Sequence, residues 1–159
     1  MEIYRGLAAG HCGHEELIDF LNYVFGMNGA DSGFYRLLPK LYKPENRPED
    51  YNYVVLEDGK LRAAVGAYPI ELEVAGHVLR GAGIGNVAVH PFHRRKGYMK
   101  DAMGQAMEAI LQSDPAGVYS LMDDETRGRY RHQVCRLARQ KGLSEIDTAE
   151  RAIQSAAQA

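Results

Sequence analysis

The chain of 159 residues is long enough for one domain with a buried core, and its 45% hydrophobic and 25% charged residues are ordinary for a soluble globular protein. The net charge of −2 gives no reason to expect nucleic acid or an anionic membrane as a partner. The two cysteines, Cys12 and Cys135, are far apart, and no stretch resembles a secretion signal or approaches the roughly 20 apolar residues of a membrane span, so we expect a cytoplasmic protein with free thiols and no membrane partner.

The first half of the chain predicts a mixture of strands and helices. In order, these are a strand at 3–8, a helix at 14–25, a weaker helix at 34–42, and strands at 51–56 and 61–67. Gly26 supplies a stop for the first helix, and residues 43–50 form a polar loop that contains two prolines. Asp58 and Gly59 join the last two strands and are a strong signal for a tight hairpin turn.

The second half continues the mixture. We expect strands at 70–74, 77–79 and 86–90, a helix at 97–111, a strand at 117–122, a helix at 126–141 and a further short helix from 144. The glycine-rich segment 81–85 favours a bulge or a close approach by another backbone or a ligand. Ala75 and Gly76 predict a turn, and Gly142 closes the helix that Asp123 and Asp124 open. This order favours an α+β or mixed α/β fold over a doubly wound sheet.

Residues 85–99 combine an apolar strand, a short basic loop and the first turn of an amphipathic helix. The first N–H groups of a helix have no partner inside it, and the helix dipole adds partial positive charge there. Arg94, Arg95 and Lys96 stand immediately before this helix. The segment therefore predicts a binding site for a phosphate or pyrophosphate.

Residues 87–91 followed by 94–99 resemble the acetyl-coenzyme A signature of the GNAT N-acetyltransferase superfamily. That signature is a glutamine or arginine, two free positions, a glycine, one free position, and a glycine or alanine. Arg94 and Gly97 match it, whereas Met99 departs from its last place. The wider pattern from Gly83 to Met99 resembles the N-terminal domain of the Eis-like (enhanced intracellular survival) acetyltransferases. The resemblance covers residues 1–130 in element order and 81–103 at the level of the motif.

The resemblance implies a GNAT-like fold, in which helices flank a central, mostly antiparallel twisted sheet, and acetyl-coenzyme A as co-substrate, without a metal. Main-chain N–H groups at the start of the helix would hold the pyrophosphate, the basic side chains would add charge, and the pantetheine arm would lie along the preceding strand. The cofactor-binding residues implied in this way are Val87, Ala88, Val89, Arg94, Arg95, Lys96, Gly97, Tyr98, Met99 and Lys100.

The reaction that the resemblance implies is direct attack of a primary amine on the thioester. A backbone N–H near Val89 would stabilise the oxyanion, and an acid would protonate the leaving thiolate. In Eis-like enzymes a tyrosine shortly after the next strand serves as this acid, and Tyr130 stands at the matching place. An ordinary helical aromatic residue explains Tyr130 equally well, so both interpretations stay open.

The resemblance ends after Tyr130. Residues 131–143 lack the aromatic-glycine-aromatic step of the family, so we expect the last strands of the sheet to be missing. The expected organisation is one acetyltransferase-like domain over 1–159 with a divergent tail over 131–159, from a stand-alone relative, a fragment or a chain whose end has diverged. An exposed sheet edge would favour pairing between chains, which predicts a homo-oligomer.

Two other functions compete with the transferase. One is a non-catalytic acyl-coenzyme A sensor, which the missing strands would allow. The other is a nucleic-acid-binding module, because residues 127–141 carry six basic residues and no acidic one. Such faces are usually only solvated, and aromatic residues other than Tyr130 are lacking there, so we expect no nucleic-acid partner.

The remaining polar clusters have simpler explanations. One cluster contains four possible metal ligands: His11, Cys12, His14 and Glu15. Their spacing matches no standard zinc pattern, and a polar turn explains the cluster better. His90 and His93 flank Pro91 near the expected thioester, and a proton relay and a plain turn explain them equally well.

We expect the amine-bearing acceptor to enter beside the first two helices. Its apolar cleft would contain Phe25, Phe34 and Tyr35, with three nearby acidic residues that could attract a cation: Glu45, Glu49 and Asp50. A solvated loop also explains these carboxylates. The sequence does not choose among a polyamine, an aminoglycoside, a peptide N-terminus and a lysine side chain.

Overall fold

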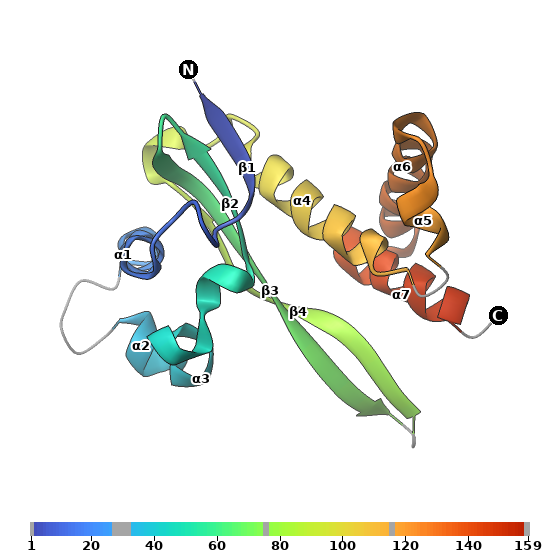
Figure 1. Ribbon diagram of the computed structural model, residues 1–159, viewed down its shortest axis with the longest axis horizontal. Helices are drawn as coiled ribbons and strands as arrows, with labels where there is room; N and C mark the ends of the chain where they lie inside the picture. Colours follow the sequence, from blue (N-terminus) through green and yellow to red (C-terminus); the bar gives the residue numbers. More distant parts are fainter. Residues whose placement is uncertain (1, 27–32, 75–76, 115–116, 158–159) are drawn as a thin grey trace. The chain divides into compact units, whose positions relative to one another are not determined.

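The computed structural model describes residues 2–26, 33–74, 77–114 and 117–157 of the chain (Figure 1). The strands are β1 (Ile3–Leu7), β2 (Asn52–Glu57), β3 (Lys60–Val74) and β4 (His77–Val89). The α-helices are α1 (His14–Val24), α2 (Phe34–Leu37), α3 (Pro39–Tyr42), α4 (Tyr98–Gln112), α5 (Val118–Leu121), α6 (Asp124–Lys141) and α7 (Glu145–Ala157). Three short 3-10 helices are η1 (Pro44–Asn46), η2 (Pro48–Asp50) and η3 (Pro91–His93). The expected fold class, a mixed α/β fold with an antiparallel sheet flanked by helices, is confirmed.

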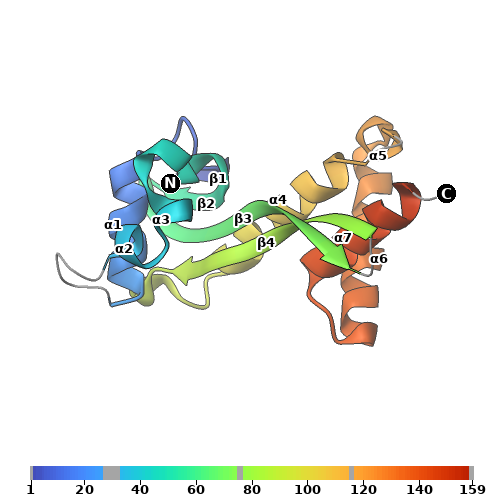
Figure 2. The same ribbon diagram turned by 90° about the horizontal axis from the view of Figure 1, so that it is seen from below.

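The four strands form one sheet in the order β1-β2-β3-β4. β1 and β2 are antiparallel, with Ile3 opposite Glu57, and β2 and β3 are antiparallel through the predicted hairpin. Asp58 and Gly59 form its turn with φ values of 50° and 70°, which is the left-handed backbone that such tight turns require. Figure 2 shows the two long strands β3 and β4 running side by side. β4 is therefore the last strand of the sheet that the described residues form.

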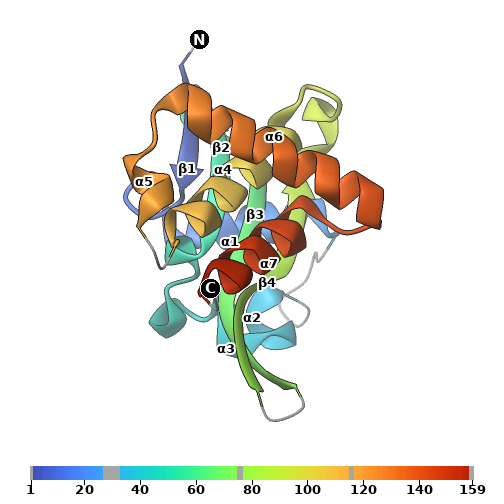
Figure 3. The same cartoon turned by 90° about the vertical axis from the view of Figure 1, so that its right-hand side faces the viewer.

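The chain divides into two compact units, of which the first contains residues 1–68 and 83–105. In this unit the sheet has apolar side chains on both faces, because its strands are covered on each side. Leu17 and Leu21 of α1 pack with Tyr42 and Val54 on one face. Val55, Val65 and the buried Tyr98 and Ala102 of α4 pack on the other. Figures 1 and 3 show α1 and the start of α4 on opposite sides of the sheet.

The second unit contains residues 69–82 and 106–159. Its longest helix, α6, has the ends that the sequence predicts. The Asp123 carboxylate accepts a hydrogen bond from the Thr126 N–H at 2.8 Å, and Gly142 ends the helix at φ 63°. The buried residues Ala138 of α6 and Ile146 of α7 belong to the core of this unit, in which α6 and α7 lie against each other (Figure 3).

The strand predicted at 117–122 is wrong, because this segment forms helix α5. Gly117 enters it at φ 66°, and the Asp114 carboxylate accepts hydrogen bonds from the N–H groups of Val118 and Tyr119, both at 3.0 Å. These bonds satisfy the first free amides of the helix. A short apolar run does not by itself distinguish a buried strand from a helical turn, so the local cap decides.

Three further segments differ from the expectation. The predicted strands at 70–74 and 77–79 are continuous with the neighbouring strands in β3 and β4, and the turn expected at Ala75 and Gly76 lies outside the described residues. The weak helix at 34–42 is divided into α2 and α3, with Pro39 at the first position of α3. The polar loop at 43–50 contains η1 and η2.

The glycine-rich segment lies inside β4, and its last member meets a close approach. A Cβ atom on Gly85 would lie 2.8 Å from Tyr68 Cε2 and 3.2 Å from Tyr42 Oη. The group that approaches Gly85 is therefore an aromatic side chain rather than the backbone or ligand expected from the sequence. Glycine is needed here because the ring occupies the space of a side chain.

Candidate functional site

A pocket of about 460 Å³ lies in the first unit beside the edge strand β4. Six residues from the end of α1, the end of β4, the loop before α4 and the start of α4 line it: Val24, Phe25, Val87, Val89, Arg94 and Met99. The sequence placed the last four of these in the coenzyme site. The pocket thus has an apolar wall and one cationic side chain, Arg94.

The alternation of side chains along β4 explains how the strand forms this wall. Val87 and Val89 point into the pocket, whereas Asn86 and Ala88 are buried in the core on the other face. Ala88 is only 1% exposed, so its side chain is a core group and its backbone is the part beside the wall. Of the predicted residues 87–89, two therefore contribute side chains to the pocket.

The loop between η3 and α4 has an unusual backbone. Arg95 adopts φ 66°, although it is not a glycine, and Gly97 adopts φ 87°. A Cβ atom on Gly97 would meet nothing within 4 Å, so glycine is required here by the backbone angle and not by crowding. The side chains of Arg94, Arg95 and Lys96 are exposed. The loop therefore presents cationic side chains directly before a helix N-terminus.

Helix α4 begins at Tyr98, so the N–H groups of residues 98–100 have no acceptor inside the helix. Free amides, the positive end of the dipole and nearby cations form a donor set that suits a phosphate. The apolar wall suits an uncharged, elongated arm. The residues present therefore fit the pyrophosphate and the pantetheine arm of coenzyme A.

Tyr98 contributes only its backbone to this donor set. Its side chain is buried, and its hydroxyl donates a hydrogen bond to Glu57 at the end of β2. This bond raises the pKa of Tyr98 and lowers the pKa of Glu57, because it favours the charged carboxylate. Arg62 Nε donates to the same carboxylate at 3.1 Å. No local sequence pattern connects Glu57 and Arg62 with the loop, so neither residue was predicted.

The two histidines near the loop do not line the pocket. Burial, followed by the charge of Arg62, lowers the pKa of His90, whose ring lies 5.3 Å from that of Tyr23. Its Nδ1 atom has no hydrogen-bond partner among the described residues. Burial also lowers the pKa of His93, whose Nδ1 atom lies 3.3 Å from Lys96 Nζ. Both imidazoles are therefore predominantly neutral at neutral pH, and a proton relay stays a prediction.

The expected acceptor cleft is formed only in part. Phe25 lines the pocket, whereas Phe34 is buried and does not line it. The ring centroids of Phe25 and Phe34 are 5.3 Å apart. Tyr35 stacks on His14 at 5.5 Å. The three acidic residues each have a cationic or basic neighbour: Glu45 and Lys43 are 3.9 Å apart, Glu49 and His14 3.3 Å, and Asp50 and Arg47 2.6 Å. Their attraction for a cationic acceptor is correspondingly reduced.

Tyr130, the candidate acid, lies on α6 in the second unit. Its side chain is 51% exposed, and its ring meets that of Tyr119 edge-on at a centroid distance of 6.1 Å. The segment that the resemblance treats as a strand before it is helix α5. The role of Tyr130 in catalysis therefore stays a prediction.

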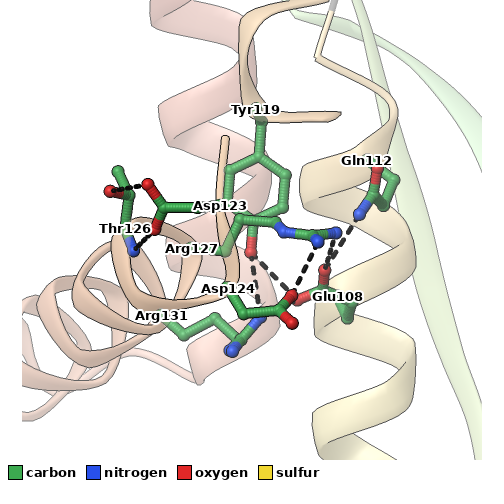
Figure 4. A network of polar contacts seen from close by, with 8 residues as sticks. All are labelled: Glu108, Gln112, Tyr119, Asp123, Asp124, Thr126, Arg127 and Arg131. Atoms are coloured by element: carbon green, nitrogen blue, oxygen red, sulfur yellow. Dashed lines mark hydrogen bonds and ion pairs between the residues drawn. The ribbon is translucent and has the colours of Figure 1, made fainter. Parts of the chain in front are cut away.

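The basic helix α6 is partly neutralised by acidic residues (Figure 4). Arg127 bonds to Asp124 at 2.7 Å, and Arg131 bonds to Glu108 of α4 at 2.6 Å. Arg129 bonds to Glu125 within the helix. Glu108 also accepts a hydrogen bond from the buried Tyr119 at 2.9 Å. Three of the six basic side chains are thus engaged with carboxylates, which weakens the case for a nucleic-acid surface.

The polar cluster at residues 11–15, near the start of α1, does not form a set of metal ligands. Cys12 is buried, and burial raises its pKa to about 12. His11 stacks on Tyr4 at 3.7 Å, and His14 pairs with Glu49. Within residues 2–26, 33–74, 77–114 and 117–157, no group of three or more His, Cys, Asp or Glu residues could hold a metal ion. None of the helices in these ranges has the length and apolar character that crossing a membrane requires.

The comparisons with known proteins agree with this arrangement. Among solved structures, a GCN5-related N-acetyltransferase from Anabaena variabilis matches with a TM-score of 0.56 and 18% identity, over 71% of this chain and 27% of that chain. Another from Kribbella flavida matches with a TM-score of 0.54 and 15% identity, over 68% of this chain and 26% of that chain. The chain spans about a quarter of the length of these two structures, and the likeness shows the fold alone.

No match is found among curated proteins. The family model described as acetyltransferase (GNAT) domain matches residues 9–123. This match includes the pocket, the basic loop and the whole of α4. Since it covers more than half of the sequence, the chain belongs to the GNAT acetyltransferase domain family.

Proposed function

We propose that this chain is an N-acetyltransferase that transfers an acetyl group from acetyl-coenzyme A to a primary amine. One observation carries the proposal: the pocket beside β4 joins an apolar wall to the free amides and cations at the start of α4. The pattern from Gly83 to Met99 further suggests the Eis-like subgroup.

The coenzyme would use both parts of this site. Its pyrophosphate would lie at the N-terminus of α4, where the amides of residues 98–100 donate and Arg94 supplies charge. Its pantetheine arm would lie along β4 beside Val87 and Val89. Because β4 ends the described sheet, its outer backbone groups are available to the amides of the arm, as in the addition of a strand.

The proposed reaction forms one bond and breaks one. The neutral amine nitrogen attacks the thioester carbonyl carbon, a C–N bond forms, and the C–S bond breaks. The nitrogen loses one proton, and the departing thiolate takes up one proton from an acid, for which Tyr130 is the candidate. A backbone N–H near Val89 would stabilise the negative charge on the carbonyl oxygen. Val24 and Phe25 would form the apolar wall on the side of α1, from which the acceptor enters.

The test is turnover with a panel of amines that contains a polyamine, an aminoglycoside, a peptide with a free N-terminus and a lysine peptide. Release of the coenzyme A thiol and the mass of the acetylated product are measured together. We expect turnover with at least one class, and a loss of at least about tenfold in Arg94→Ala, because a charge-assisted phosphate contact is removed. Arg129→Ala is the matched control, since Arg129 is exposed on α6 and pairs with Glu125.

Unchanged turnover in Arg94→Ala would contradict the proposed coenzyme site. Tight binding of acetyl-coenzyme A without turnover on the whole panel would contradict the transferase and favour a sensor. An equal loss of turnover in Arg129→Ala would show that losing any surface arginine has the same effect.

A further inference from the structure

Glu57 contacts both ends of the loop that presents the proposed phosphate site. After the loop, the Tyr98 hydroxyl donates a hydrogen bond to Glu57 Oε1. Before the loop, His93 Nδ1 lies 3.6 Å from Glu57 Oε2. One carboxylate on the sheet therefore binds Tyr98 and lies close to His93, the two residues that flank the segment 94–97.

The Glu57 carboxylate is itself held in place. Arg62, across the β2–β3 hairpin, donates to Oε2 at 3.1 Å, and the side chains of Glu57 and Arg62 are only 12% and 15% exposed. Lys96 lies near the same group, and His93 accepts a hydrogen bond from it at 3.3 Å when its ring is neutral. Glu57 does not line the pocket.

The loop needs such support because its backbone is strained. Arg95 occupies the left-handed region at φ 66°, which a residue with a Cβ atom rarely adopts. A strained conformation persists only where its surroundings hold it. The Tyr98 bond fixes the first residue of α4. The charge of Lys96, which lies in the loop and donates to His93 Nδ1 at 3.3 Å, attracts the Glu57 carboxylate, so the chain between His93 and Tyr98 has little freedom to relax.

We propose that Glu57 is a positioning residue that holds the loop 94–97 and the first amides of α4 in the conformation that binds the coenzyme's phosphates. The proposal rests on the proposed function for the identity of the ligand. A carboxylate would repel a phosphate in direct contact, so the expected role of Glu57 is exerted through Tyr98 and Lys96. The pantetheine part of the site, formed by Val87 and Val89, does not depend on this support.

Because only the phosphate part of the site depends on Glu57, the experiment compares a ligand that has phosphates with one that lacks them. Binding is measured for acetyl-coenzyme A by calorimetry and for S-acetylpantetheine, which has the same thioester arm without phosphates, by NMR titration. The variants are Tyr98→Phe, which removes one hydroxyl and keeps the ring, and Glu57→Gln. The matched control is Arg5→Gln, which breaks another link between the sheet and the first turn of α4, the Arg5–Asp101 ion pair at 2.7 Å.

We expect both variants to bind acetyl-coenzyme A about tenfold more weakly, which corresponds to the loss of one charged hydrogen bond, that between Tyr98 and Glu57. Their affinity for S-acetylpantetheine should stay within about twofold of that of the unaltered chain, because only the phosphate part of the site is changed. The Arg5→Gln control should bind both ligands normally. Amide hydrogen exchange of residues 101–104, the first hydrogen-bonded amides of α4, should be about tenfold faster in Tyr98→Phe in the free protein, with exchange in α6 unchanged.

Equal losses for both ligands, or no loss for either, would overturn the positioning role. The same holds for unchanged exchange over residues 101–104, a result that needs no ligand and no activity. If the unaltered chain does not bind acetyl-coenzyme A, the proposed function fails instead, while the exchange measurement still decides whether Glu57 holds the loop.

Discussion

Asn86 on β4 donates a hydrogen bond from Nδ2 to Asn52 Oδ1 on β2 at 2.9 Å, although β3 lies between these strands. Both side chains are buried, and Gly66 on β3 leaves the space for this bond. Tyr42 donates to Asn86 Oδ1 at 2.7 Å, and Asn52 Nδ2 donates to Tyr68 Oη at 3.0 Å. The network ties β4 to the centre of the sheet immediately before Val87, where the pocket begins.

Removing one member of this network should cost more than removing both partners. Asn86→Leu leaves Asn52 Oδ1 and the Tyr42 hydroxyl buried without their partner, so we expect a loss of about 2–4 kcal/mol in the free energy of unfolding. Urea denaturation measures this loss. The double variant Asn86→Leu, Asn52→Leu should lose less than the sum of the two single variants. Strict additivity would show that the two amides do not act together.

Gly66 and Gly104 provide a matched pair of substitutions with opposite effects. A Cβ atom on Gly66 would lie 2.6 Å from both Asn86 Oδ1 and Tyr68 Cε2, so Gly66→Ala should destabilise the protein by about 1–3 kcal/mol. Gly104 lies within α4 with nothing within 4 Å of a Cβ atom, so Gly104→Ala should stabilise it by about 0.5–1 kcal/mol. Thermal unfolding compares them, and equal signs would contradict this packing.

Glu108 should make the stability of the second unit depend on pH. Its burial raises the pKa, but hydrogen bonds from Arg131, Gln112 and Tyr119 outweigh burial and lower the pKa (Figure 4). A lowered pKa gives stabilisation that is present above the unfolded-state pKa and is lost as pH falls through the folded-state pKa. The stability difference between the unaltered chain and Glu108→Gln should be full at neutral pH and shrink below about pH 4. A difference that grows on acidification would contradict the assigned direction.

Gly97→Ala distinguishes two reasons for a glycine at this position: its backbone angle, which affects stability, and close approach of the ligand, which affects affinity. A Cβ atom meets no neighbour in the free protein, so the φ of 87° alone should cost about 1 kcal/mol of stability, as a modest fall in Tm. If the coenzyme's phosphates approach this position closely, the affinity for acetyl-coenzyme A should fall further than the stability change explains. Unchanged affinity in the folded variant would show that the phosphates do not lie against Gly97.

Local signals predicted the elements whose ends are fixed locally. Asp123 and Gly142 cap α6 through groups within a few residues, and the angles at Asp58 and Gly59 are intrinsic to a tight hairpin. The resemblance over residues 87–99 implied a coenzyme site that contains Val87, Val89, Arg94 and Met99, and these four residues line the pocket. By contrast, Glu57 is 41 residues from Tyr98, and only the folded hairpin brings it to the loop.

A local cap and one tertiary contact explain the wrong strand at 117–122. The Tyr119 hydroxyl donates a hydrogen bond to Glu108 of α4, and the Asp114 carboxylate caps the helical turn. An apolar run in the sequence indicates neither contact. Tertiary contacts also explain why only one of the two phenylalanines expected in the acceptor cleft lines the pocket. Phe25 faces the pocket, while Phe34 packs edge-on against Tyr42 at 4.8 Å.

Calorimetric titration of acetyl-coenzyme A into the unaltered chain and into the double variant Arg94→Ala, Gly97→Asp tests the central claim most directly. We predict saturable binding of one coenzyme per chain, and binding weaker by at least about tenfold in the variant, which loses a cation and gains an anion at the phosphate site. Circular dichroism confirms that the variant is folded. Absence of binding to the unaltered chain, or equal affinity in the folded variant, would contradict the coenzyme site beside β4.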